Sequence, residues 1–525
     1  MVTANCLFAF DFCKRIVALK NRRVNALRTH EQYNIFLHFG CESIDSFSRR
    51  CYNFVNTQTR SFPMDIEKYL PQMVETIQNA VRIKTVLDSP VDGGPFGKGN
   101  KECLEYVLSV ADKLGFKTKN LDGYCGYAEV GDGDEIVGII GHLDVVPEGD
   151  GWIHPAYSGE LVDGEIWGRG TIDDKGPAII SLFAVKALMD EGMKFSKRVR
   201  VIFGCNEETG SKCVEHYLEV DEPISYGVSP DSEFPVIFAE KTINGIELKG
   251  KSDCGNDVKL VRLDGGIVIN AVPDICNFTL ETSKENALKI ADEIEGKLLK
   301  NSVASSHTVR GGEIDFKVFG KAAHGSIPQC GVNAISYSLD ALKDVVDCEF
   351  VRIYNTYIST CVHGEKLGCY AHDEYGDIAV NVGLCTFENG EYSIKINSRL
   401  PFSTDTNTMF NSIKETLKCE NGVKLLLLSD SKGFKIDPNS KMIQVLTNAY
   451  RKVTGDVKSE PICTPGGTYA REFSNCVAFG PEMNGYGEMI IHQPNERISL
   501  EAIKAIFEIY HTAYRDLINE VSFKK

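Results

Sequence analysis

Two features that would point to a membrane or to nucleic acid are missing from this sequence. Its 525 residues hold no apolar run near the ~20 residues that span a bilayer. The longest candidate, residues 178–188, is interrupted by Ser181 and Lys186, and we expect it to be a buried helix. Basic residues are in deficit, with 57 Lys and Arg against 73 Asp and Glu and a net charge of −16. This balance argues against nucleic acid or an anionic membrane as the main partner.

Paired cysteine motifs are also missing. The 18 cysteines are spread over the chain and none are arranged as CxxC, so no zinc finger is indicated. No convincing signal peptide precedes them, which makes a disulfide framework the weaker interpretation. We therefore expect most cysteines to be reduced core residues and the protein to be cytoplasmic.

The first 60 residues differ from the rest in composition. They hold nine Lys and Arg against four Asp and Glu, one glycine and no proline. A helix pattern starts only at Met64. We expect residues 1–63 to be a basic extension that is non-native or disordered, with a targeting sequence as the alternative.

From Met64 onward, strand-like runs alternate with helical patterns. Residues 136–141 and 199–204 are short apolar runs of strand type, whereas residues 177–188 have helical length and spacing. Such alternation predicts an α/β fold, with a mostly parallel mixed sheet and helices on both of its faces.

The order of elements changes between about residues 242 and 435. There, strand-like runs enclose two helical stretches, which is an α+β order and predicts an inserted second domain. The runs are residues 266–280, 313–319, 378–383 and 392–396, and the helical stretches are residues 285–299 and 332–345. The first domain is then predicted to consist of residues 64–241 and 436–525.

Five segments carry metal-ligand or acid–base side chains after strand-like runs, where open α/β sheets place their sites. They are His142 with Asp144, Asp173 with Asp174, Glu207 with Glu208, Asp231, and His492. Together they supply imidazoles and carboxylates, the ligand set suited to zinc or a similar divalent ion. Each segment alone has a structural alternative, such as a packed histidine, an acidic helix N-terminus or a solvated turn.

Two other site types lack support. In residues 168–176 the third glycine of a dinucleotide motif is replaced by Asp173, and adjacent carboxylates would repel a pyrophosphate. No G-x-S-x-G elbow occurs, so a nucleophilic serine hydrolase is not indicated.

In this order, the five segments resemble the zinc metallopeptidase family of carboxypeptidase G, aminoacylase and the PepV-type dipeptidases. The resemblance covers the chain from about Met64 to its end, and residues 229–236 and 464–471 favour the PepV branch. It implies two Zn²⁺ ions, with Mn²⁺ or Co²⁺ as alternatives. One ion would be held by His142 and Asp231, the other by Glu208 and His492, and Asp173 would bridge them.

The resemblance also implies roles for residues around the metals. Glu207 would be the general base, Asp144 would orient the ring of His142, and the peptide between Asp173 and Asp174 would be cis. In the inserted domain, which would act as a lid, His324 and Asn270 would stabilise the oxyanion. Arg399 would hold the substrate.

The implied activity is hydrolysis of dipeptides, or of short peptides with a free amino end, by a monomeric enzyme. Two alternatives stay open. A deacylase of N-acyl amino acids on the same fold would share every metal residue. A non-catalytic scaffold would be signalled by loss of Glu207 or of a ligand, and none is lost.

Overall fold

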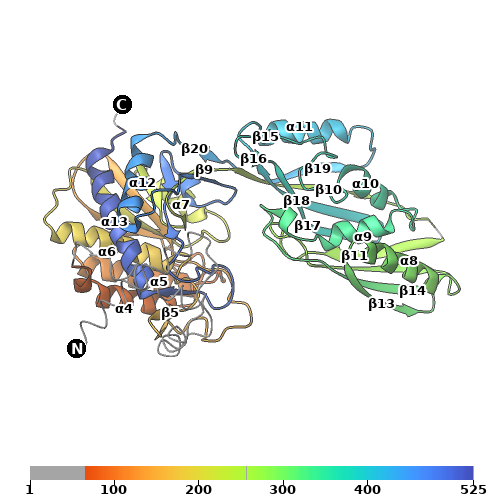
Figure 1. Cartoon of the computed structure of the whole chain (residues 1–525), viewed down its shortest axis with the longest axis horizontal. Coiled ribbons are helices and arrows are strands. Elements are labelled where there is room, and N and C mark those ends of the chain that lie inside the picture. The colour runs from red at the N-terminus through yellow and green to blue at the C-terminus, as the bar shows by residue number, and fades with distance from the viewer. Residues whose placement is uncertain (1–64, 256, 524–525) are drawn as a thin grey trace, which may run out of the picture.

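The computed structural model describes residues 65–255 and 257–523. The predicted extension, residues 1–63, lies outside this part of the chain. Two lobes are visible in Figure 1, each with its own sheet and its own hydrophobic core, and they are joined by a narrow neck. We call them the first lobe and the lid.

The first lobe is built on a nine-stranded mixed sheet. Its strand order is β1-β2-β6-β3-β7-β22-β9-β20, with β21 paired to β9, and β3 is parallel to both of its neighbours. The strands are β1 (Lys117–Leu121), β2 (Cys125–Val130), β3 (Ile136–His142), β6 (Arg198–Gly204), β7 (Tyr226–Ser229), β9 (Ile237–Glu240), β20 (Phe434–Lys435), β21 (Ile462–Thr464) and β22 (Cys476–Ala478). Every residue of β3 is buried, which requires cover on both faces of the sheet. The predicted α/β class is confirmed.

Helices supply that cover. They are α4 (Leu70–Val81), α5 (Lys98–Lys113), α6 (Lys175–Asp190), α7 (Lys212–Val220), α12 (Lys441–Thr454) and α13 (Leu500–Glu520). Helix α6 includes the predicted helix 177–188 and is apolar on nearly all sides, because it packs against β3, α4 and α13. Helix α13 is capped by Ser499, whose side chain accepts a hydrogen bond from the amide of Ala502.

The lid is built on an eight-stranded antiparallel sheet in the order β13-β14-β12-β11-β17-β18-β10-β19. The strands are β10 (Thr242–Lys251), β11 (Val258–Gly265), β12 (Ile275–Thr282), β13 (Ala304–Arg310), β14 (Glu313–Phe319), β17 (Ala379–Glu388), β18 (Glu391–Leu400) and β19 (Lys424–Ser431). The helices are α8 (Ala287–Lys300), α9 (Ala334–Leu342), α10 (Glu349–Tyr357) and α11 (Thr406–Thr416).

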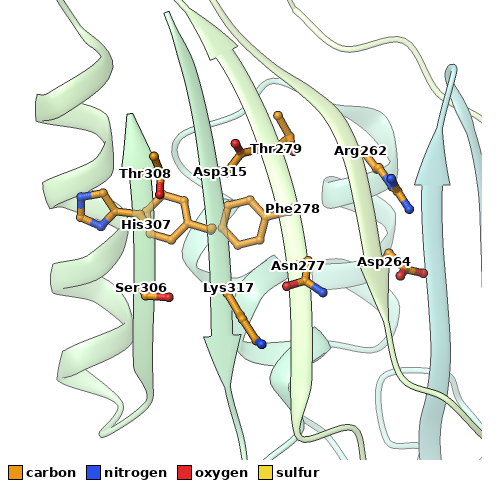
Figure 2. A pocket seen from close by; sticks show the side chains of 11 residues that line it. Arg262, Asp264, Asn277, Phe278, Thr279, Ser306, His307, Thr308, Asp315 and Lys317 are labelled. Atoms are coloured by element: carbon orange, nitrogen blue, oxygen red, sulfur yellow. Dashed lines mark hydrogen bonds between the residues drawn. The ribbon is translucent and has the colours of Figure 1, made fainter. Parts of the chain in front are cut away.

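Burial alternates along the lid strands, because helices cover only one face of this sheet. On β14, Ile314, Phe316 and Val318 are buried, while the residues between them are not. The opposite face carries polar side chains such as Asp264, Asn277 and Lys317, which line a shallow pocket (Figure 2). This pocket lies on strands far along the sheet from the neck, so it is not the site built below.

Three predictions about the lid need correction. Of the run 266–280, only Ile275 onward is strand. Residues 266–274 leave the sheet at Gly266, whose φ of +82° suits glycine and where a Cβ would lie 1.9 Å from the Gly383 carbonyl oxygen. Strand β20 falls inside the predicted insertion 242–435, yet it pairs with β9 of the first sheet. Helices α10 and α11 were not predicted.

The cysteines largely match the expectation of buried thiols. Of the 12 free cysteines in the described part of the chain, eight are buried. Cys254 and Cys348 form a disulfide within the lid, which was not expected. In residues 65–255 and 257–523, no helix combines the length and the apolar character needed to cross a membrane.

Candidate metal centre

The candidate ligands gather where three neighbouring strands of the first sheet end. Strand β3 ends at His142, β6 ends at Gly204 shortly before Glu207, and β7 ends at Ser229 shortly before Asp231. Because β3 is parallel to both β6 and β7, these three strand ends share one edge of the sheet. The predicted segments are therefore brought together by sheet topology.

Asp173 lies between two imidazoles. Its Oδ1 is 3.0 Å from Nε2 of His142, and its Oδ2 is 2.8 Å from Nε2 of His492. His492 Nε2 also lies 3.2 Å from the carboxylate of Glu208. A single carboxylate thus offers one oxygen toward each histidine, which is the arrangement of a bridging ligand.

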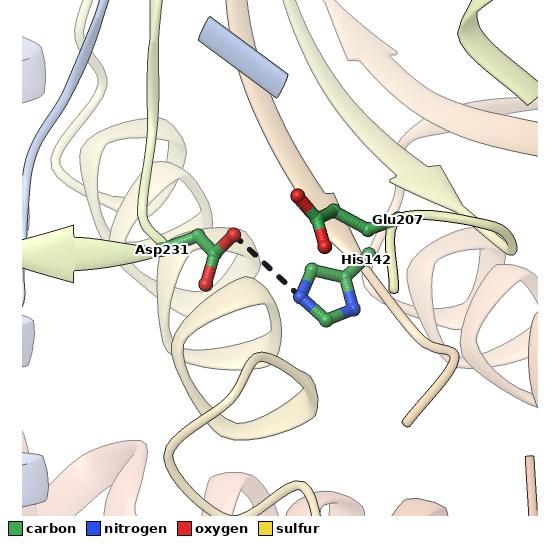
Figure 3. Close-up of side chains that lie close together, drawn as sticks. All are labelled: His142, Glu207 and Asp231. Atoms are coloured by element: carbon green, nitrogen blue, oxygen red, sulfur yellow. Dashed lines mark ion pairs between the residues drawn. The ribbon is translucent and has the colours of Figure 1, made fainter. Parts of the chain in front are cut away.

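His142 is shared by two groups of candidate ligands. Its Nε2 lies 3.6 Å from Oδ2 of Asp231, and Glu207 faces the same space (Figure 3). Ligand atoms of His142, Glu207 and Asp231 lie within 4.8 Å of one another, and so do those of His142, Asp173 and Glu208. Both groupings contain residues predicted from the sequence.

Asp144 contacts both the ring of His142 and the turn that carries the two glutamates. The ring Nδ1 of His142 is 2.9 Å from the backbone carbonyl oxygen of Asp144, whereas the Asp144 carboxylate is 3.6 Å away. That carboxylate instead accepts hydrogen bonds from the amides of Glu207 at 2.9 Å and Glu208 at 3.1 Å. Asp144 therefore orients the ring through its main chain and fixes the turn of the two glutamates through its side chain.

The loop that carries Asp173 is held by a residue that the sequence analysis did not identify. Glu496 is fully buried and accepts hydrogen bonds from the amides of Gly170, Ile172 and Asp173, as well as from Arg169. The expected cis peptide between Asp173 and Asp174 is present. No local pattern marks Glu496, since its partners lie more than 320 residues away along the chain.

Carboxylates dominate the electrostatics of this centre. Burial and the neighbouring Asp231 raise the pKa of Glu207 well above its usual range. Burial raises the pKa of Asp231 to about 7, with Asp173 adding to the effect. Burial alone would lower the pKa of His142, but the surrounding carboxylates, Asp231 first, raise it well above its ordinary value.

These observations fit a bound cation. Like charges crowded away from water require a compensating positive charge. Nε2 of His142 is buried and faces carboxylate oxygens of Asp173 at 3.0 Å and Asp231 at 3.6 Å, so an ion between these groups would have ligand atoms on several sides. Imidazole nitrogens and carboxylate oxygens are the donors that zinc and similar divalent ions take. His142, Asp173, Glu208, Asp231 and His492 would hold such ions.

The three predicted lid residues lie near one another. Gly325 donates its amide to the carbonyl oxygen of Asn270 at 2.7 Å, and Ala271 pairs with His324, so the two segments are adjacent. Burial, Arg399 and His492 lower the pKa of His324, in that order of effect. His492 belongs to the metal centre, so His324 lies within the range of its charge.

Arg399 is the most deeply placed of the three. It lies on β18 and is 4% exposed, and its Nε and Nη1 have no hydrogen-bond partner among the described residues. A buried guanidinium without a partner is costly, so this group is suited to receive an anion. Within residues 65–255 and 257–523, no lid side chain forms a hydrogen bond or an ion pair with a candidate ligand.

Comparison with known proteins places the chain in a family. The family described as Peptidase family M20/M25/M40 matches residues 138–516. The chain belongs to this peptidase family. It is therefore a hydrolase that acts on peptide bonds, and its family resemblance inferred from the sequence is confirmed.

Curated relatives match nearly their whole length. A protein of Staphylococcus haemolyticus named "Putative dipeptidase" is 34% identical over 467 residues, which cover 87% of this chain and 99% of the relative. A Bacillus subtilis protein, also named as a putative dipeptidase, is 31% identical over 468 residues, with the same coverage.

Solved structures share the fold of this M20 chain. The dipeptidase Dug1p of Saccharomyces cerevisiae has a TM-score of 0.51 at 14% identity, covering 87% of this chain and 98% of its own. A tripeptidase of Staphylococcus aureus has a TM-score of 0.51 at 14% identity, covering 86% and 99%. At this identity the likeness concerns the two-lobed fold alone.

Two further residues beside the site were missed by sequence reasoning. Asn381 is buried and donates to the carbonyl oxygens of Ile269 and Ala271 at 3.2 and 2.8 Å, which fixes the loop that presents Asn270. The pKa of Glu482 is raised to about 7 by burial and by the negative charges of Glu233, Asp173 and Asp231. Both depend on contacts across the fold, which no local pattern encodes.

Proposed function

We propose that this M20 peptidase hydrolyses dipeptides, and short peptides with a free amino end, with two divalent metal ions, in the first instance zinc. The position of Asp173 carries the proposal, because its two oxygens face His142 and His492 at 3.0 and 2.8 Å. The dipeptidase names of relatives at 34% and 31% identity support the substrate class.

Residues of the first lobe would supply proton transfer and position the group that carries it out. Bound metal would polarise the substrate carbonyl and make water acidic enough to lose a proton near neutral pH. Glu207 takes the proton from the attacking water and passes it to the leaving amine, a role that suits a carboxylate whose pKa is raised by burial. Asp144 holds the Glu207 amide at 2.9 Å and so fixes where that carboxylate can reach.

The lid supplies the remaining groups. His324 and Asn270 would donate hydrogen bonds to the oxygen on which negative charge develops. Arg399 would bind the terminal carboxylate of a short substrate, since its guanidinium is buried and without a partner in the described chain. A substrate held between the metal centre and Arg399 has room for few residues.

We further propose that the enzyme acts as a cytoplasmic monomer without nucleic acid or membrane partners. The influence of His492 on His324 within one chain supports a complete site in a single copy. The net charge of −16 and the buried free thiols are consistent with the proposed location.

A substrate comparison tests the function. The metal-loaded enzyme is given free dipeptides, N-acyl amino acids and a long peptide, and the release of amino acids is measured by chromatography. Turnover of dipeptides with at most slow turnover of the others is expected. Efficient turnover of N-acyl amino acids alone would make the protein a deacylase, and internal cleavage of the long peptide would contradict the role of Arg399.

A further inference from the structure

The two lobes are joined by two short stretches of chain, which we call the hinge strands. The first is residues 240–242, where β9 passes into β10, and the second is residues 431–434, where β19 passes into β20 (Figure 1). They run side by side, because the amide of Gly433 donates to Oγ1 of Thr242 at 2.9 Å. A Cβ at Gly433 would lie 2.2 Å from the carbonyl oxygen of Glu240, so glycine permits this close approach.

One arginine of the first lobe contacts both hinge strands. Arg471 lies in a short 3₁₀ helix, Tyr469–Glu472. Its Nε donates to Oε2 of Glu240 at 2.9 Å, and its Nη1 donates to Oγ of Ser431 at 2.8 Å. Its Nη2 donates to the carbonyl oxygens of Gly466 at 2.9 Å and Lys241 at 3.3 Å. A planar guanidinium with several fixed donors suits this use better than an ammonium group.

Glu240 is fixed from a second side. Its Oε1 accepts from Oγ1 of Thr468 at 2.8 Å, and its Oε2 accepts from the Thr468 amide at 3.2 Å. The side chain of Glu240 is fully buried and that of Arg471 is 5% exposed. A buried ion pair whose hydrogen bonds are all made has little freedom, because any shift leaves a charged group unpaired away from water.

Arg399 lies close to this cluster. On β18 it is directly opposite Ile243, two residues beyond Lys241 of the first hinge strand. Burial and then the positive charge of Arg471 lower the pKa of Arg399 to about 10, which places the two guanidinium groups near each other. A shift of the first hinge strand therefore moves Arg399 directly, because β10 and β18 are paired.

We propose that Arg471 is a positioning residue for the reaction: by holding both hinge strands, it fixes where the Arg399 guanidinium stands relative to the metal centre. This inference rests on the proposed function, since it assigns the terminal carboxylate of the substrate to Arg399. A residue that only stabilised the fold would leave the recognition of that carboxylate unchanged in the folded enzyme.

The experiment compares a free dipeptide with its C-terminal amide. Arg399→Ala removes the proposed carboxylate-binding group, so it gives the largest expected fall in the ratio of kcat/KM for dipeptide over amide. Arg471→Lys keeps a charge beside Glu240 but cannot reach Ser431 at the same time. We expect it to reduce the ratio of kcat/KM for dipeptide over amide at least fivefold, mainly through KM, with bound metal unchanged. The double variant should have the same ratio as Arg399→Ala.

Two further variants separate positioning from stability. Ser431→Ala removes only the Nη1 contact, folds without a new buried charge, and should reduce the same ratio by a smaller factor. Arg200→Lys is the matched control. Arg200 is 1% exposed and paired with Glu129 at 2.7 Å, but it lies on β6, several strands away from β9 and β20. An unchanged ratio in both hinge variants, or an equal fall in Arg200→Lys, would overturn the proposal.

Solution scattering supplies a readout that needs no turnover. Arg471→Lys should have a larger radius of gyration than the parent protein, while Arg200→Lys should not. A parent enzyme that does not cleave dipeptides would refute the proposed function, yet the scattering result would still test the hinge. Unchanged scattering in Arg471→Lys would refute the hinge role even if dipeptides are cleaved.

Discussion

The metal centre and the lid differ in how their candidate site residues are arranged. In the centre, Asp173, Glu208 and Asp231 come from distant segments, and each has a carboxylate oxygen within 3.6 Å of a histidine nitrogen. In the lid, Asn270 and His324 lie on adjacent segments and Arg399 lies on a strand. Within the described chain, none of them forms a hydrogen bond or an ion pair with a candidate ligand. In the function proposed above, metal binding and proton transfer thus belong to one lobe, and recognition of the substrate belongs to the other. Substitutions in the two regions should therefore change different measured quantities.

The largest expected effect comes from neighbouring residues within the metal centre. Glu207→Gln should lower kcat by about 10²–10⁴-fold, because the general base is lost, while both metals are retained. Glu208→Gln should lower metal occupancy and activity together, because Glu208 contacts His492 at 3.2 Å. Metal analysis beside steady-state kinetics measures both quantities.

The same pair also defines what would contradict these assignments. Loss of metal from Glu207→Gln would assign metal binding to Glu207 and leave proton transfer to Glu208. A Glu207→Gln enzyme that keeps more than about a tenth of the parent rate would show that Glu207 does not transfer the proton.

In the lid, His324→Ala should lower kcat by about 10²–10³-fold with metal content unchanged, because the lost donor serves the developing oxyanion. The measurement is kcat and KM on a dipeptide together with bound metal. Exposed His372, which contacts Asp377 elsewhere in the lid, offers a control substitution. Loss of metal from His324→Ala would place this histidine among the metal ligands. It would contradict the assignment of metal binding to the first lobe alone.

A smaller effect concerns stability and pH. The pKa of Asp231 is raised from 3.8 to about 7, and that of His492 from 6.5 to about 11. Both groups bind protons more tightly in the folded state than in the unfolded state. Without metal, the free energy of unfolding therefore falls as pH rises and these protons are lost, through about pH 7 for Asp231 and toward pH 11 for His492.

Metal replaces those protons, so the rise in Tm caused by zinc should be several degrees larger at about pH 8.5 than at about pH 5.5. Scanning fluorimetry with and without chelator, at each pH, measures the difference. A zinc-induced shift that shrinks as pH rises would contradict this charge balance.

The smallest effect is expected at the amino end. A chain that starts at Met64 should keep activity within about twofold and an unchanged Tm, because the segment before it contributes no predicted element or site residue. Activity and Tm of the shortened and full-length proteins are compared. Loss of more than half the activity, or poor folding, would show that residues 1–63 take part in the structure.

The sequence alone determined the family and the fold class, and it predicted which side chains gather at the site. Strand-like runs followed by His142, Glu207 and Asp231 predicted ligands at strand ends, because β-strand patterning and metal-ligand chemistry are both local properties. Their order along the chain identified the peptidase family, which the match over residues 138–516 confirms.

The tertiary structure decided what depends on contacts between distant segments. Asp144 orients His142 by its carbonyl group, Glu496 holds the Asp173 loop through three amides, and Arg471 joins both hinge strands. Strand β20 belongs to the first sheet because it pairs with β9, about 195 residues earlier in the chain. Local patterns carry no information on such pairings, because the free energy of each comes from a partner that only the folded chain brings near.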